Sequence, residues 1–205
     1  MGKVSAKILS VLFHPLILTT IGTVILFNSG SILDFLSFNA KKIILLIVFV
    51  CTFILPLTFV PFFIFQKIIK NVQMENNRER LVPFFVTSIL YFFCYYLLVR
   101  LNAPEIKTIV LFVLAAAINV FVLFLISFKY KISAHMAGIG GLTGALIAIS
   151  FILNINLEYF IIITIIVSGI IGYSRLKLKT HKQYQIYIGW FTGLIISFVV
   201  LFFFY

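Results

Sequence analysis

The sequence predicts an all-α protein, a polytopic transmembrane helix bundle of about seven spans, with six also compatible with the pattern. Hydrophobic residues make up 63% of the 205 residues and only 10% are charged, whereas soluble domains carry about 25% charged residues. The apolar residues fall into runs of about 20, long enough to cross a bilayer as a helix. Lysine and arginine gather between these runs. We therefore expect one integral membrane domain over residues 1–205.

The first predicted span covers residues 8–27 and follows Lys3 and Lys7. No A-x-A cleavage site follows this run, so we interpret it as an uncleaved anchor. His14 and Pro15 interrupt it. A histidine at membrane depth usually faces other protein or a cavity and is a functional candidate, while a histidine beside a proline kink is also typical of a structural role. The sequence leaves both roles open for His14.

Six further spans are predicted. The second, residues 43–65, is broken by Pro56 and Pro61. The third has Pro83 in its first turn, a position that tolerates the missing N–H, and runs to about residue 101. The others are expected at 106–128, with the lone Asn119, and at 133–155, 158–172 and 184–205.

Glycines predict close packing among the last three of these spans. Small residues three or four positions apart let membrane helices approach one another. Such glycines occur in all three spans: Gly138, Gly140, Gly141, Gly144, Gly169, Gly172, Gly189 and Gly193. We expect this packing to bring the loop ends of the three helices together.

The basic residues predict the orientation of the bundle. Seven spans place the N-terminus and the loops before the third, fifth and seventh spans on one face. That face holds 12 of the 16 lysines and arginines, because only Lys41, Lys42, Arg100 and Lys107 lie on the other. The positive-inside rule then makes the crowded face cytoplasmic. Each of its three loops also leads into the positively polarised N-terminus of a helix.

The segment from Ser174 to Gln185 is the main candidate for a functional site. Ser174 and Arg175 are followed after five residues by His181 and after three more by Gln185. Thr180 and Gln183 have the spacing of a capping box, which predicts a helix that starts at Thr180 with His181 in its first turn. Free N–H groups there, beside an imidazole and a guanidinium, favour an anion. A basic loop with one incidental histidine is the alternative.

These residues resemble the type 2 phosphatidic acid phosphatases, the PAP2 superfamily. The third signature of that family is serine-arginine, five residues, histidine, three residues and aspartate, and Ser174, Arg175 and His181 match it. Ser133-Ala134-His135 is similar to the second signature, proline-serine-glycine-histidine. Arg80, near Pro83, is similar to a remnant of the first. The resemblance covers about residues 66–193 and implies a PAP2-like core.

The resemblance also implies roles. His181 is the expected nucleophile that attacks phosphorus, His135 the general acid, and Gln185 the residue that orients His181. The expected phosphate-binding residues are Arg78, Arg80, Lys131, Ser133, Ser174 and Arg175. The sequence departs from the family at Ile132 and Ala134, in the spacing around Arg78 and Arg80, and at Gln185, where the family has aspartate. An amide oxygen accepts the same hydrogen bond as a carboxylate but brings no negative charge, and loss of the charge in a serine-protease triad costs about 10⁴ in rate.

The expected function is that of a lipid phosphate phosphatase in a membrane, by resemblance the bacterial inner membrane. It needs no cofactor and no metal, and it acts on a lipid such as phosphatidic acid, phosphatidylglycerol phosphate, a polyprenyl (di)phosphate or phosphorylated lipid A. No metal or nucleotide motif occurs, no nucleic acid is expected, and Cys51 and Cys94 lie inside apolar runs. The alternative is a non-catalytic relative that binds a lipid phosphate or serves as a subunit of an assembly. A small transporter is disfavoured because no acidic residue lies at mid-membrane depth.

Overall fold

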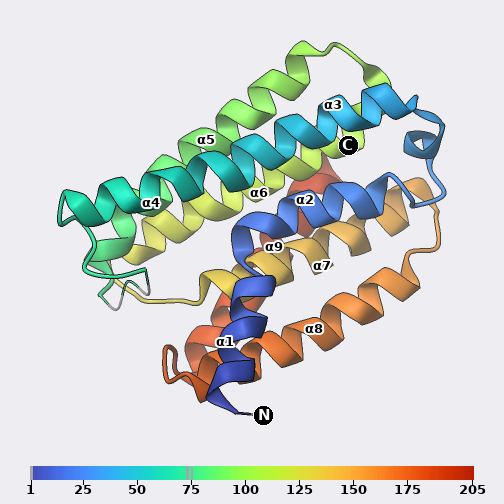
Figure 1. The fold of residues 1–205 in the computed structure, drawn as a ribbon. Coiled ribbons are helices and arrows are strands. Elements are labelled where there is room, and N and C mark those ends of the chain that lie inside the picture. The colour runs from blue at the N-terminus through green and yellow to red at the C-terminus, as the bar shows by residue number, and fades with distance from the viewer. Residues whose placement is uncertain (1, 73, 75) are drawn as a thin grey trace.

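The computed structural model describes residues 2–72, 74 and 76–205, and in this part of the chain it is helical without any strand (Figure 1). Short 3₁₀ turns lie at Ile32–Phe35, Arg78–Arg80 and Pro104–Ile106, and a π-helical segment lies at Val50–Ile54. The α-helices are α1 (Lys3–Leu12), α2 (Pro15–Leu26), α3 (Phe38–Phe49), α4 (Leu55–Phe65), α5 (Leu81–Arg100), α6 (Lys107–Ser127), α7 (Ala134–Leu153), α8 (Glu158–Lys177) and α9 (Gln183–Phe204).

Six helical stretches of the described chain are long and apolar enough to cross a membrane, and α1 with α2 makes a seventh if this bent pair is one span. This confirms the all-helical class and the expected six or seven spans, which are compatible with an integral membrane protein. The six stretches are Phe38–Phe65, Arg78–Arg100, Pro104–Ser127, Ala134–Leu153, Glu158–Lys177 and Gln183–Phe204.

The first predicted span is not a continuous helix. Its two halves, α1 and α2, meet at an angle of 55°. His14 has an extended backbone with φ −63° and ψ 136°, and its Nδ1 accepts a hydrogen bond from the Leu16 N–H at 3.4 Å. Pro15 takes the first position of α2, where its missing N–H removes no helical hydrogen bond. The run predicted at 8–27 is therefore bent at the interruption that the sequence showed, because His14 caps a new helix.

Pro56 changes the second span without ending it, since the helical run continues from Phe38 to Phe65 through the π-helical segment. A proline has no N–H for the carbonyl four residues before it, which here is that of Thr52. The Tyr91 hydroxyl of α5 donates a hydrogen bond to this carbonyl at 3.3 Å. The neighbouring helix thus supplies the donor that Pro56 lacks, as is common in membrane helices.

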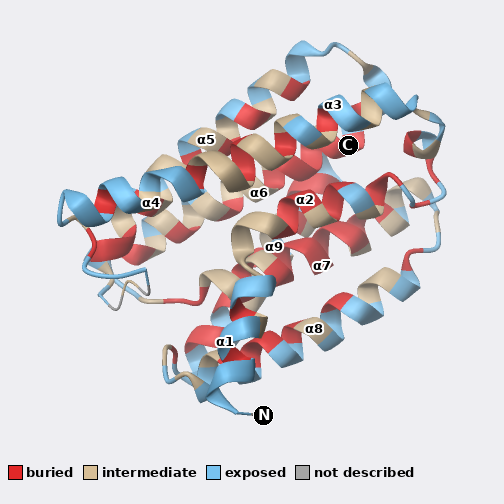
Figure 2. Ribbon diagram, in the orientation of Figure 1, coloured by how far each residue is buried: buried red, intermediate tan, exposed pale blue. Residues whose placement is uncertain are grey.

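Helix α7 is the centre of the bundle. About 67% of its most apolar window is buried, against 28% in α8, and Figure 2 shows buried residues along α7, which lies beside α9 and α2. The contact with α9 is close enough that a Cβ on Gly140 would overlap the Trp190 carbonyl oxygen and one on Gly193 would overlap the Ala137 carbonyl oxygen. The predicted glycine packing is confirmed for these two helices. Gly169 of α8 takes no part, because nothing lies within 4 Å of the Cβ position.

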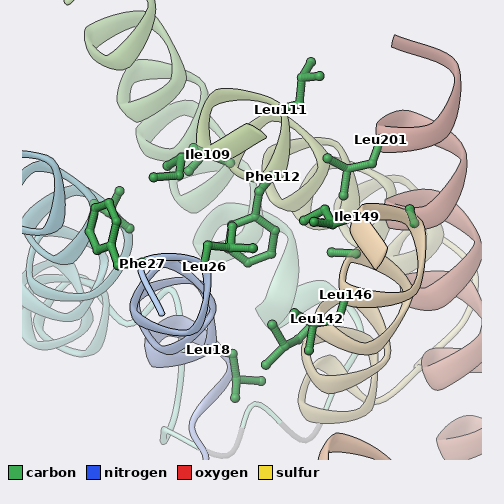
Figure 3. Close-up of a cluster of buried hydrophobic side chains, with 14 of the residues drawn as sticks. Leu18, Leu26, Phe27, Ile109, Leu111, Phe112, Leu142, Leu146, Ile149 and Leu201 are labelled. Carbon is green, nitrogen blue, oxygen red and sulfur yellow. The ribbon is translucent and has the colours of Figure 1, made fainter. Parts of the chain in front are cut away.

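The apolar core joins α2, α6, α7 and α9. Figure 3 shows Leu26 of α2 and Phe112 of α6 beside Leu146 and Ile149 of α7, with Leu201 of α9 on the far side. The outward faces carry exposed apolar side chains, for example Ile162, Ile163, Ile165 and Ile166 on α8. Such a ring of exposed apolar surface suits a lipid environment, since monomeric soluble proteins rarely expose large apolar patches.

Three connections meet at one end of the bundle, as the charge pattern predicted. The Arg80 guanidinium donates from Nη1 to the Ile132 carbonyl at 2.8 Å, which joins the α4–α5 and α6–α7 connections. Asn77 donates to the Lys129 carbonyl at 3.3 Å across the same pair. The backbone N–H of Ser133 donates to the Gln185 carbonyl at 3.1 Å, which ties the start of α7 to the first turn of α9.

Candidate functional site

A cavity of about 700 Å³ opens where these connections meet. Its apolar walls come from inner turns of α2, α4, α5, α6 and α7, and include Leu18, Phe63, Phe84 and Phe112. Its charged groups and histidines come from helix ends, from α1 and from the α8–α9 connection: Lys7, His14, Arg80, His135, Arg175 and His181. Tyr91 lines it from the middle of α5. The volume lies within the range of small-molecule sites, about 300–1,000 Å³.

His181 lies just before α9, because that helix begins at Gln183 and not at Thr180 as its sequence predicted. Lys182 is the residue before the helix, and its backbone N–H donates to Gln185 Oε1 at 3.0 Å. The Thr180 hydroxyl instead donates to the Arg175 carbonyl at 3.1 Å, at the end of α8. The capping box is therefore formed by Lys182 and Gln185, two residues later in the chain than the expected pair of Thr180 and Gln183.

The tautomer of His181 follows from its hydrogen bond to Gln185. Its Nδ1 lies 3.2 Å from Gln185 Oε1, the oxygen that also accepts from Lys182. An amide oxygen only accepts, so Nδ1 carries the proton and Nε2 keeps a lone pair. Within the described part of the chain, Nε2 has no hydrogen-bond partner. The pKa of His181 is lowered to about 3, chiefly by burial and further by the charges of Arg80 and Arg175, so the imidazole is neutral at neutral pH.

Arg80 is held rigidly at the wall of the cavity. It is only 5% exposed, and besides its bond to Ile132 it donates from Nε to the Met74 carbonyl at 3.1 Å. Glu79 is also buried, and its Oε1 accepts from Asn76 at 3.2 Å. Among the described residues no carboxylate forms an ion pair with Arg80. The charge of the adjacent Glu79 acts on Arg80 without a direct ion pair between the two described side chains.

Arg175 and His135 meet at Ser10 of α1. Arg175 Nη1 donates to Ser10 Oγ at 2.7 Å, and its buried Nε has no partner within the described residues. His135 Nε2 lies 2.9 Å from the Ser10 carbonyl oxygen and 3.3 Å from Ser10 Oγ. The His14 ring packs edge-on against the His135 ring, with centroids 5.4 Å apart. His14 thus both caps α2 and lines the cavity.

The cavity brings together Arg80, His135, Arg175 and His181, but not the other expected site residues. Gln185 does not line the cavity, and its Oε1 lies 3.2 Å from His181 Nδ1. Ser133 caps α7 by accepting the Met136 N–H at 3.4 Å, and the Ser174 hydroxyl donates to the Ile170 carbonyl at 2.7 Å. Arg78 and Lys131 do not line the cavity, although the charge of Lys131 contributes to the lowered pKa of His181.

Sequence reasoning did not assign Lys7 or Ser10 to the site. Both lie next to or within the first apolar run, and Ser10 is 165 residues from its partner Arg175. One signal was present, because Lys7, Ser10 and His14 follow the i, i+3, i+7 spacing of one helix face. This polar stripe in an apolar segment marks the side that faces the cavity.

No protein-family model, no curated protein and no solved structure matches the chain. Among the described residues, no group of three or more His, Cys, Asp or Glu side chains is arranged to hold a metal ion. The cavity is lined by two guanidinium groups and by a neutral imidazole of fixed tautomer. Such a set suits an anion with several oxygen atoms.

Proposed function

We propose that this protein is a PAP2-like integral membrane phosphatase that removes phosphate from a membrane lipid through a phosphohistidine at His181. The observation that carries the proposal is the placement of His181 Nε2, with its lone pair, beside the cavity that Arg80 and Arg175 also line. A nucleophile and two cations in one cavity are what phosphoryl transfer requires, since that reaction depends mainly on positioning and on stabilising negative charge.

Arg175 supports a phosphate ligand in particular. Its Nε is buried without a partner in the described chain, and a buried unsatisfied donor costs about 1–3 kcal/mol. A phosphate oxygen at that position accepts this hydrogen bond and removes the cost. The apolar walls of the cavity, among them Leu18 and Phe63, suit the hydrocarbon part of a lipid. The ligand class that satisfies both parts of the cavity is a lipid phosphate.

In the proposed reaction the lone pair of His181 Nε2 forms a bond to phosphorus, and the bond from phosphorus to the lipid oxygen breaks. The departing oxygen takes a proton, which by the family resemblance comes from His135. Arg80 and Arg175 stabilise the charge that develops on the phosphoryl oxygens. Water then attacks phosphorus and returns a proton to His135, the P–N bond breaks, and inorganic phosphate leaves. Throughout, the Gln185 oxygen holds the Nδ1 proton of His181.

A second candidate function, binding of a lipid phosphate without hydrolysis, is favoured by two observations. His135 Nε2 is engaged by the Ser10 carbonyl, and Gln185 places no negative charge beside His181. Both features lower the expected rate of phosphoryl transfer, and neither interferes with binding of a lipid phosphate to Arg80 and Arg175. The two functions share one site and differ only in the release of phosphate.

The deciding experiment measures inorganic phosphate released by the purified protein, without added metal, from phosphatidic acid, phosphatidylglycerol phosphate, and a polyprenyl phosphate and diphosphate. We expect His181→Ala to lower turnover by about 10³-fold or more while lipid binding persists, because this change removes only the nucleophile. Arg175→Ala is expected to weaken both binding and turnover.

The matched control is Gln183→Ala, which changes an exposed residue two positions from His181. It is expected to retain wild-type turnover. Full activity of His181→Ala would show that His181 is not the nucleophile. Tight binding of a lipid phosphate with no release by the wild-type protein would establish the binding function instead.

A further inference from the structure

We propose that Ser10 of α1 is a positioning residue of the phosphate site, which holds the Arg175 guanidinium toward the ligand. This inference rests on the proposed function and extends it. The family resemblance lies within residues 66–193, whereas the structure adds a wall to the site from the bent pair α1–α2. The site is thus completed by the N-terminal segment of the chain.

The contacts of Ser10 are specific. Its hydroxyl oxygen accepts from Arg175 Nη1 at 2.7 Å, and its backbone carbonyl oxygen lies 2.9 Å from His135 Nε2. One residue thereby fixes one of the two guanidinium groups and the ring of the expected proton donor. Because the hydroxyl accepts from Arg175, its own hydrogen remains available to a ligand oxygen.

The helix that carries Ser10 is built to present it inward. Ser10 is only 6% exposed and Ala6, one turn earlier, is fully buried, whereas Val4, Ile8 and Val11 are between 60% and 73% exposed. The bend at His14 and Pro15 turns α1 so that this buried side lies against α8, near Arg175 (Figure 1). The exposed apolar side is left for lipid. The hydroxyl therefore lies in the protein-facing stripe.

Arg175 needs such a partner because its other contacts are few. Apart from the bond to Ser10, its guanidinium makes no hydrogen bond within the described chain, and its buried Nε is unsatisfied. Arg80, in contrast, has two backbone carbonyl partners. Loss of the Ser10 hydroxyl should leave Arg175 free to change rotamer and should leave Arg80 in place. The protein should then bind the phosphate ligand more weakly, and this loss of affinity should occur only when Arg175 is present.

The test compares Ser10→Ala with Ser5→Ala, a control on the exposed side of the same helix. Binding of dioctanoyl phosphatidic acid and its hydrolysis are measured on the full chain, each also in an Arg175→Ala background. We expect Ser10→Ala to raise Kd about 10-fold, in line with the loss of a hydrogen bond to a charged group, and to lower kcat/KM by at least the same factor, because Arg175 also stabilises the developing charge. In the Arg175→Ala background the same change should have no further effect. Ser10→Thr, which keeps the hydroxyl, should restore the affinity.

The outcomes separate this inference from the proposed function. If the wild-type protein hydrolyses the lipid and Ser10→Ala behaves like Ser5→Ala, the positioning role is wrong and the phosphatase function stands. If the protein binds without hydrolysis, and Ser10→Ala weakens binding only when Arg175 is present, the positioning role stands and the catalytic proposal fails. An additive effect of the two substitutions overturns the positioning role. A protein that neither binds nor hydrolyses a lipid phosphate overturns both.

Discussion

One oxygen atom of the Gln185 side chain accepts both a hydrogen bond at the start of α9 and one from His181. Its Oε1 accepts from the Lys182 backbone and from His181 Nδ1, while its Nε2 lies 3.3 Å from the Tyr184 hydroxyl. Glutamate or glutamine at this helix position is typical of a capping box. The structure thus ties the orientation of His181 to the start of α9, and it makes Gln185 the residue at which charge can be restored without moving the backbone.

We predict that Gln185→Glu raises the rate of phosphate release about 10-fold or more. Glutamate keeps the length of the side chain and both accepted hydrogen bonds, adds a negative charge that stabilises the imidazolium, and lies favourably at a helix N-terminus. Gln185→Asp restores the charge expected from the family but is one methylene shorter, so its gain should be smaller. Phosphate release and thermal unfolding are measured for both variants. Slower and less stable variants would indicate a pocket shaped for the neutral amide.

A second prediction at the scale of single residues concerns the stability of the protein at acidic pH. Burial and the nearby guanidinium groups lower the pKa of His181 to about 3 from 6.5. The unfolded chain therefore binds this proton more readily than the folded one, and the contribution of His181 to stability is present above pH 6.5 and lost as the pH falls toward 3. Thermal unfolding of wild type and His181→Ala is compared between pH 7.5 and 4.5. The wild type should lose about 2–3 kcal/mol more than the variant over this range. Parallel pH profiles would contradict the lowered pKa.

At the scale of the elements, the contact between α7 and α9 positions the site. Helix α7 carries His135 in its first turn, and α9 carries Gln185 in its first turn. The glycines let the two backbones approach until carbonyl oxygens of one helix occupy the space where the other would carry a Cβ. In a membrane, where lipid is as apolar as the side chains, such close packing is a main source of helix association. The distance between His135 and His181 is thus set by residues remote from both.

We predict that Gly193→Ala destabilises the protein by about 1–3 kcal/mol and lowers turnover. The added methyl group would overlap the Ala137 carbonyl oxygen, so α9 must move and carry Gln185 with it. Gly169→Ala on α8 is the control, because its methyl group meets nothing within 4 Å. That variant should keep its activity and gain up to about 1 kcal/mol from helix propensity. The measurements are thermal unfolding and phosphate release. Equal behaviour of the two variants would count against the role of the α7–α9 contact.

For the whole molecule, the charges and the cavity lie at the same end of the bundle. The connections that meet around the cavity carry Lys67, Lys70, Lys129, Lys131 and Lys179 in addition to the site arginines. The opposite end carries Lys41, Lys42, Arg100 and Lys107. The positive-inside rule counts lysines and arginines in short loops, which are the kind of loop found here. From this balance of charge we predict that the cavity opens toward the cytoplasm.

We predict that a cysteine placed at Lys129 is protected from a membrane-impermeant thiol reagent in intact cells, whereas a cysteine at Lys42 is labelled. Both positions are exposed and lie at opposite ends of the bundle. The native Cys51 and Cys94 are buried and are replaced by alanine in the background protein. Labelling after the cells are permeabilised shows that Lys129→Cys is reactive. The reverse pattern in intact cells would place the site on the outer face.

The sequence by itself determined the helical class, the approximate spans, the close contact between α7 and α9, and the meeting of three basic connections at one end. These features depend on local hydrophobic runs, on small residues at helical spacing and on charge counts, all of which can be evaluated within one segment. The first turn of α5 around Pro83 is another such local feature.

Only the tertiary structure decided the start of α9 and the membership of the site. Thr180 and Gln185 both offer capping oxygens, and the choice between them depends on whether the Thr180 hydroxyl is taken by the end of α8. Ser10 becomes part of the site only because a bend at His14 lays α1 against α8, which brings it to Arg175. Hydrogen bonds between residues far apart in the chain depend on how the helices pack. Helix packing depends on all the helices of the bundle together, so it cannot be predicted from the sequence of any one segment.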